Sequence, residues 1–100
     1  MEEVQLQLNE KNQGHFYIKE NEEQIGEMQV GISRNALTVF HTEVVPKAEG
    51  KGLAKKLFLA MVDYARKNHF YVVALCPYTH AQFKRHADEY ADIWKNNQPL

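Results

Sequence analysis

The sequence lacks most of the features that mark specialised classes of protein. It has one cysteine, Cys76, in 100 residues, so it cannot form an intramolecular disulfide and suits a reducing compartment. It contains no apolar run near the roughly 20 residues that span a membrane. Residues 1–9 carry two acids and no apolar core, unlike a secretory or transit signal. We therefore expect a cytoplasmic protein that does not insert into membranes.

The chain also has no large excess of acidic or basic residues, because its formal net charge is -1. The charges are nevertheless uneven: residues 1–27 hold seven acids against two lysines, whereas residues 47–86 hold eight basic residues against two acids. This balance is not basic enough overall for a nucleic-acid-binding protein. The cationic segment suits a smaller polyanion.

The length and composition predict one domain that spans residues 1–100. Hydrophobic residues make up 44% of the chain and charged residues 25%, as in ordinary globular proteins. A chain of this size can bury a sufficient core without a disulfide or a structural metal.

Apolar and polar residues alternate in the first half of the chain, which is typical of half-buried strands. Turn-forming clusters separate the alternating segments, so we predict an antiparallel meander. Its strands are expected at residues 4–8, 15–19, 25–32 and 37–44.

The second half changes period, because apolar residues recur at three- and four-residue steps from Leu53 to about Asn68. This predicts a long helix, followed by a fifth strand at residues 71–76. The capping-box spacing of Thr79 and Gln82 predicts a second helix that ends near His86. Three residues of the tail 88–100 are expected to act as packing anchors, Tyr90, Ile93 and Trp94. The fold class is therefore α+β with a mixed sheet.

The junction between the fourth strand and the long helix predicts an anion site. The first amide N–H groups of a helix have no intrahelical partner, and the helix dipole favours negative charge there. Glycine at positions 50 and 52 lets a phosphate approach the backbone. The cofactor-binding candidates are Val44, Val45, Lys47, Ala48, Glu49, Gly50, Lys51, Gly52, Leu53, Ala54, Lys55 and Lys56. The alternative is that both glycines serve only a tight turn.

The segment Lys47-Ala48-Glu49-Gly50-Lys51-Gly52 resembles the pyrophosphate signature of the GNAT N-acetyltransferases, Gln/Arg-x-x-Gly-x-Gly/Ala, with lysine at its first position. The flanking segments 41–44 and 75–78 resemble the short GNAT-like branch of about one hundred residues. The resemblance implies the GNAT fold, with a curved, mainly antiparallel sheet and a central helix. It also implies a fifth strand parallel to the fourth and splayed from it, and acetyl-coenzyme A (acetyl-CoA) as co-substrate.

Two departures from larger GNAT enzymes affect the expected chemistry. Only residues 9–14 separate the first two strands, where those enzymes carry helices that form the acceptor site. The acceptor side should therefore be open or completed by a partner chain, and we expect a monomer or a weak homodimer. Those enzymes often protonate the departing thiolate with a tyrosine in the helix after the fifth strand. Phe83 lies in that region here, and Tyr78 is the nearest phenol.

Three further residues are candidates for catalysis. Strand alternation places His41 and Glu43 on one face together with Leu37 and Val39, so both are candidate bases beside the loop. His41 is equally compatible with a structural histidine, and Glu43 with a solvated charge. Cys76 is a candidate nucleophile or base, or a small buried hydrophobe.

A zinc site formed by Cys76, His80 and His86 is disfavoured, because only three potential ligands cluster and His86 lies beyond the first helical turns. We therefore expect no metal. Two functions remain open: an N-acetyltransferase that moves acetyl from acetyl-CoA to an amine by direct attack or a Cys76 relay, and a non-catalytic module that binds acyl-CoA.

Overall fold

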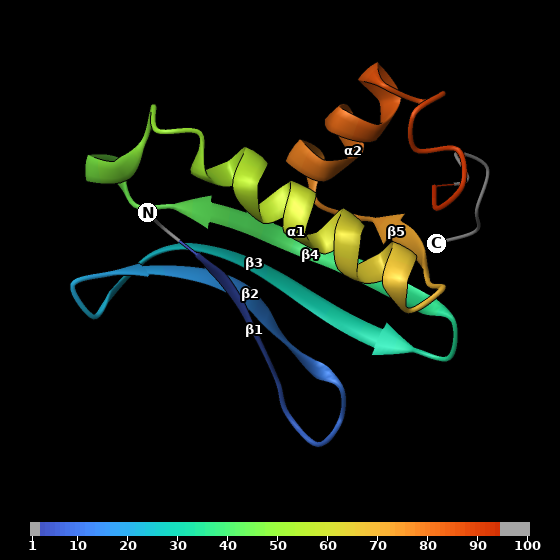
Figure 1. Ribbon diagram of the computed structural model, residues 1–100, viewed down its shortest axis with the longest axis horizontal. Coiled ribbons are helices and arrows are strands. Elements are labelled where there is room, and N and C mark those ends of the chain that lie inside the picture. Colours follow the sequence, from blue (N-terminus) through green and yellow to red (C-terminus); the bar gives the residue numbers. More distant parts are fainter. Residues whose placement is uncertain (1–2, 95–100) are drawn as a thin grey trace.

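A five-stranded sheet with two helices forms the protein in the computed structural model, which describes residues 3–94 (Figure 1). The strands lie in sequence order in the sheet; β1 to β4 pair antiparallel, and β5 runs parallel to β4. The elements are β1 (Val4–Leu8), β2 (Gln13–Glu20), β3 (Glu23–Ser33), β4 (Ala36–Val44), the 3-10 turn η1 (Pro46–Ala48), α1 (Leu53–Lys67), β5 (Tyr71–Ala74) and α2 (Pro77–Arg85). The predicted α+β fold and order of elements are confirmed.

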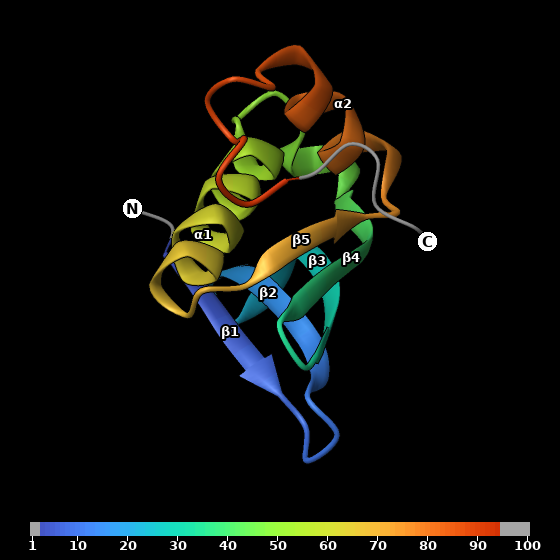
Figure 2. The same cartoon turned by 90° about the vertical axis from the view of Figure 1, so that its right-hand side faces the viewer.

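Both helices lie on the same side of the sheet (Figures 1 and 2). The apolar stripe of α1 buries Leu57, Phe58 and Met61, and Tyr64 meets the Phe16 ring of β2 edge-on at 5.8 Å between ring centroids. Within residues 3–94 no helix covers the other face of the sheet, and neither helix is long and apolar enough to cross a membrane. The core therefore lies between the sheet and the helices, and one sheet face is left open.

A β-bulge at Phe40 changes the direction of the side chains along β4. Val39 pairs with Val30 and His41 pairs with Gln29, so Phe40 is an extra residue without a cross-strand partner. The prediction that His41 shares a face with Val39 is therefore wrong, and so is the same prediction for Glu43 and Leu37. Because of the bulge, His41 and Glu43 point to the sheet face that no helix within residues 3–94 covers, and Thr42 and Val44 point toward the helices.

The parallel ladder between β4 and β5 stops at the same bulge. Its last pair is Val39 with Ala74, and the amides of Leu75 and Cys76 both donate to the Val39 carbonyl at 3.0 Å. Strand β5 is thus shorter than predicted. Beyond Val39 the chain from β5 turns into α2, so β4 continues alone toward the loop before α1.

The start of α2 also differs from the predicted capping box. Pro77 occupies the first helical turn and Cys76 is the N-cap residue, so the helix begins before Thr79. Thr79 is fully buried inside the helix instead of capping it. Proline fixes φ near its helical value, and the capping-box interpretation overlooked this stronger start signal.

The C-terminal segment packs as predicted. Tyr90, Ile93 and Trp94 are buried, and Trp94 stacks on Phe83 at 5.5 Å between ring centroids. The Val72 amide of β5 donates to the Ile93 carbonyl at 2.8 Å. Residues 95–100 of the predicted tail lie outside the described residues.

Candidate functional site

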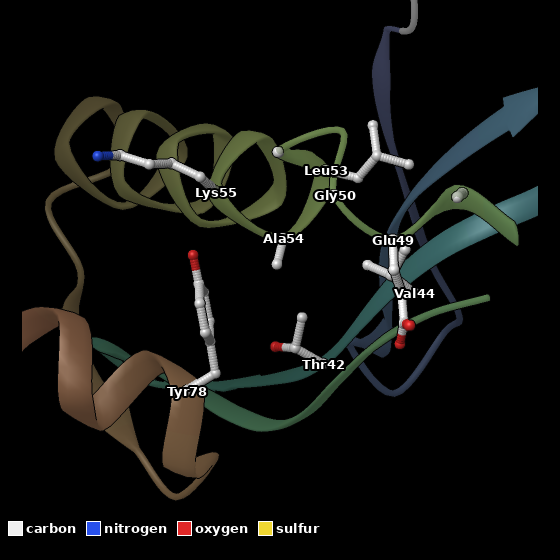
Figure 3. Close-up of a pocket in the computed structure, with 10 residues that line it drawn as sticks. Thr42, Val44, Glu49, Gly50, Leu53, Ala54, Lys55 and Tyr78 are labelled. Atoms are coloured by element: carbon white, nitrogen blue, oxygen red, sulfur yellow. The ribbon is translucent and has the colours of Figure 1, made fainter. Parts of the chain in front are cut away.

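A pocket of about 390 Å³ lies where the end of β4, the loop before α1 and the start of α2 meet (Figure 3). This volume is within the range of small-molecule sites. Its lining combines an apolar floor with an exposed loop backbone. The lining residues are Thr42, Val44, Ala48, Glu49, Gly50, Gly52, Leu53, Ala54, Lys55 and Tyr78.

The two loop glycines are in backbone conformations that L-residues rarely adopt. Gly50 has φ +87° and Gly52 has φ +74°, both in the left-handed region. A Cβ built at either position would meet nothing within 4 Å, so the protein itself leaves the space beside this backbone empty. The loop is therefore an open cradle whose shape depends on glycine.

The start of α1 borders this cradle. Gly52 is the N-cap residue, and the first helical hydrogen bond runs from the Lys56 amide to the Gly52 carbonyl at 3.1 Å. The amides of Leu53, Ala54 and Lys55 precede that bond, so they are available to an anion, and the helix dipole adds partial positive charge. The geometry fits a phosphate group.

The predicted lysines separate into different environments. Lys55 lines the pocket, whereas Lys47 pairs with Glu23, whose hydrogen bond and charge raise the pKa of Lys47. Lys51 is exposed, Lys56 is half-buried, and neither lines the pocket. Val45 is also outside the lining, and its amide donates to the Ile25 carbonyl at 3.0 Å.

Cys76 lies at the N-terminus of α2 and is only 2% exposed. Its Sγ is 3.3 Å from the Thr42 hydroxyl, with which it shares a hydrogen bond. Burial raises the pKa of Cys76, but hydrogen bonds from Thr42 and from the first turn of α2 outweigh burial and leave the pKa below its usual value. The buried Thr79 hydroxyl is close enough to contribute to this shift, yet it has no hydrogen-bond partner of normal geometry among the described residues.

Tyr78 projects its hydroxyl into the pocket from α2 (Figure 3). Its ring meets Phe58 edge-on at 6.5 Å between centroids. Burial raises the pKa of this hydroxyl above the usual tyrosine value, so it stays protonated and able to donate. Phe83 is fully buried among other rings, which leaves Tyr78 as the phenol of the pocket.

His41 and Glu43 lie on the open face of the sheet, outside the lining of this pocket. Their side chains are exposed and pair with each other at 3.6 Å between Nε2 and Oε1. The sequence missed Thr42, which takes the inward position between them. Val44 was predicted to line the site, and Thr42, two residues earlier on the same strand, shares its face. The sequence analysis did not draw this consequence, because it placed His41 and Glu43 toward the site and did not foresee the bulge at Phe40.

No metal centre is formed by the predicted candidates. Across residues 3–94 no group of three His, Cys, Asp or Glu side chains could hold a metal ion. The sulfur of Cys76 is engaged by Thr42, and the ring of His80 packs edge-on against Trp94 at 5.8 Å between centroids.

A family model of the GCN5-related N-acetyl-transferases matches residues 15–93, more than three quarters of the chain. The chain belongs to this family. The matched segment begins inside β2 and includes β3 to β5, the glycine loop, both helices and the tail as far as Ile93. The family assignment confirms the resemblance that the loop signature indicated. The chain has no significant match among curated protein sequences.

Solved structures show the same GNAT fold. A GCN5-like candidate N-acetyltransferase from Staphylococcus aureus is 25% identical, with a TM-score of 0.69 over 94% of this chain and 90% of its own. A ribosomal-protein-alanine N-acetyltransferase from Brucella melitensis biovar Abortus is 17% identical, with a TM-score of 0.61 over 81% of this chain and 64% of its own. An aminoglycoside N-acetyltransferase in complex with CoA is 15% identical, with a TM-score of 0.56 over 89% of this chain and 72% of its own.

The connection between β1 and β2 is as short as the sequence predicted. β1 and β2 form a direct hairpin in which Leu8 pairs with Gly14, so no helix is inserted between them. Within residues 3–94 the sheet face opposite α1 is consequently without a covering helix.

Proposed function

We propose that this protein binds acetyl-CoA in the pocket before α1 and transfers the acetyl group to an amine by direct attack. The observation that carries the proposal is the open cradle at Gly50 and Gly52, placed directly before the free amides of α1. Family membership and the CoA complex of a structural neighbour support the same ligand. We further propose that residues 1–100 act as one domain in the cytoplasm.

The chain offers distinct contacts to each part of the co-substrate. We assign the pyrophosphate to the loop backbone and the first amides of α1, with Lys55 as the nearby cation. We assign the pantetheine arm to the side of the pocket that Thr42 and Tyr78 line. When bound, acetyl-CoA supplies a thioester carbonyl and a thiolate leaving group.

Acetyl transfer needs a neutral amine, a base that takes its proton and an acid for the departing thiolate. Tyr78 is the proposed acid, because its hydroxyl points into the pocket and is held protonated. Glu43 and His41 are the proposed bases and lie on the opposite face of β4 from the pocket. The acceptor would approach from that face, so acid and base act from opposite sides of the strand.

Non-catalytic binding of acyl-CoA is the second candidate function. The observation that favours it is the open sheet face, where within residues 3–94 no helix encloses an acceptor. A sensor or subunit would need the cradle but neither the acid nor the base.

Calorimetry and CoA release together test the proposal. We expect CoA and acetyl-CoA both to bind, because the phosphates and the pantetheine arm supply most contacts and the acetyl group few. Acetyl-CoA should then release free CoA when amines, polyamines or lysine peptides are added. Binding without release for any acceptor would favour the sensor function. Absence of binding at millimolar concentration would mean that the loop is only a turn.

Direct attack predicts that Cys76→Ala keeps acetyl transfer at a comparable rate. The side chain is almost fully buried against Thr42, so its loss should lower the free energy of unfolding by about 1 kcal/mol, a typical cost of truncating a small core residue. Intact-protein mass spectrometry after incubation with acetyl-CoA, followed by hydroxylamine, checks the alternative. A hydroxylamine-sensitive acetyl adduct that Cys76→Ala removes together with turnover would establish a relay.

A further inference from the structure

The open face of the sheet has a definite arrangement of side chains, fixed by strand register. Phe16 and Met28 pair across β2 and β3 and are buried toward the helices, so their neighbours point the other way. The bulge at Phe40 puts residues 41 and 43 on that same side. On β5 the buried Val72 leaves Tyr71, Val73 and Leu75 on the open face.

Three large apolar side chains are concentrated on this face. Phe40 is 47% exposed, Leu75 is 44% and Tyr71 is 39%, and only one other large apolar side chain in residues 3–94, Leu59, is comparably exposed. Phe40 and Leu75 follow the last β4–β5 pair, and Leu75 is held to the backbone of Val39. We name Phe40, Tyr71 and Leu75 the apolar strip. Phe40 and Leu75 border the point at which β4 and β5 separate, and Tyr71 lies at the other end of β5, paired with Ala36.

Two carboxylates lie beside this strip. Glu27 and Glu43 are direct cross-strand partners on β3 and β4, an arrangement that like charges normally disfavour. Each glutamate contacts a histidine. Glu27 Oε2 lies 3.0 Å from His15 Nδ1, and Glu43 Oε1 lies 3.6 Å from His41 Nε2. Phe40, His15 and Glu27 line one shallow hollow. An amine cation placed between the two carboxylates would offset their mutual repulsion.

We propose that the open face binds a polypeptide segment that presents a lysine among apolar side chains, and that this lysine is the acetyl acceptor. The inference rests on the proposed function, because it names the acceptor of that same site. The apolar strip fits the flanking side chains, and the glutamate pair fits the ammonium group as it arrives. Glu43 then takes the proton that the attacking amine must lose.

Two other occupants fit the face less well. A small free polyamine would leave the apolar strip uncovered, because it carries no large apolar group. A two-fold contact between copies of this chain, centred on the glutamate pair, would bring four carboxylates together. A lysine-bearing peptide satisfies the apolar and the acidic parts of the face at once.

The test uses CoA-saturated protein and two peptides that differ only at the flanks of one lysine, leucine in one and serine in the other. Amide chemical shifts in NMR are followed as each peptide is added, and spermidine serves as the small amine. We expect the leucine peptide to shift amides of β4 and β5 near Phe40 and Leu75 and to bind about tenfold more tightly than the serine peptide. Replacement of its lysine by norleucine should weaken binding.

Matched variants locate the contact. Phe40→Ala and Leu75→Ala should each weaken binding of the leucine peptide about tenfold, whereas Leu59→Ala removes an equally exposed side chain from α1 and should leave binding unchanged. Glu27→Gln should weaken binding and lower its dependence on salt. The three alanine positions are exposed, so the fold should persist in each variant.

The outcomes separate this inference from the proposed function. If CoA shifts the amides at residues 50–55 but neither peptide shifts the open face, the co-substrate site stands and the peptide acceptor is wrong. With acetyl-CoA in place of CoA, acetylation of spermidine as fast as that of the leucine peptide would overturn the inference too. So would self-association that Phe40→Ala abolishes. If CoA itself shifts no amide in the loop, the proposed function fails first.

Discussion

Gly52→Asp should abolish measurable CoA binding while the protein stays folded. Gly52 sits in the left-handed region beside empty space, so a side chain there would enter the cradle that we assign to the pyrophosphate. A carboxylate about 4 Å from a phosphate costs about 4 kcal/mol at an effective dielectric constant near 20. This corresponds to a Kd roughly a thousandfold higher, which isothermal titration calorimetry would register as loss of binding. Gly50→Asp should act in the same way.

Gly52→Asn is the matched control, because asparagine has nearly the same shape as aspartate, tolerates positive φ and carries no charge. It should retain part of the affinity, which separates the steric effect from the electrostatic one. Lys55→Ala should be milder, by about 0.2 to 1 kcal/mol for an exposed charge contact, and Lys56→Ala, outside the pocket lining, should be milder still. Unchanged affinity in both aspartate variants would place the co-substrate elsewhere on the molecule.

Tyr78→Phe should lower kcat by about 10² to 10⁴, the usual contribution of a general acid, with little change in the Kd of acetyl-CoA. The substitution removes only the hydroxyl that points into the pocket and keeps the ring that packs on Phe58. Steady-state kinetics with a responsive acceptor, together with calorimetry, would separate the two quantities.

The pH profile gives a second measurement for Tyr78. Burial raises its pKa above 10.0, the usual value, so the acid form should persist to higher pH than in a free phenol. The wild-type rate should fall only when the pH exceeds the raised pKa of Tyr78. Tyr78→Phe should not show this fall at alkaline pH. Tyr64→Phe, which removes a hydroxyl from α1 outside the pocket lining, should behave as wild type. Wild-type kcat in Tyr78→Phe would show that water or another group protonates the thiolate.

Local sequence patterns predicted the helices and strands and the glycine loop before α1. The meander, the long helix and the existence of a fifth strand follow from residue periodicity, which depends only on near neighbours in the chain. The parallel direction of that strand was implied only by the resemblance to the GNAT family. The glycine loop was predictable for the same reason, because Gly50 and Gly52 adjoin a helix start in the sequence itself. The structure adds that eight of the predicted cofactor-binding residues line one pocket, whereas Lys47 lies outside it and pairs with Glu23.

Only the tertiary structure decided which side chains of β4 enter the pocket. A one-residue bulge at Phe40 reverses the alternation, so Thr42 faces the pocket while His41 and Glu43 face the open side of the sheet. No local signal marks that bulge, because it arises from the register in which β4 pairs with β3, an interaction between residues distant in the sequence. The proximity of Thr42 to Cys76 has the same origin, since the two residues meet only where β4 and β5 separate.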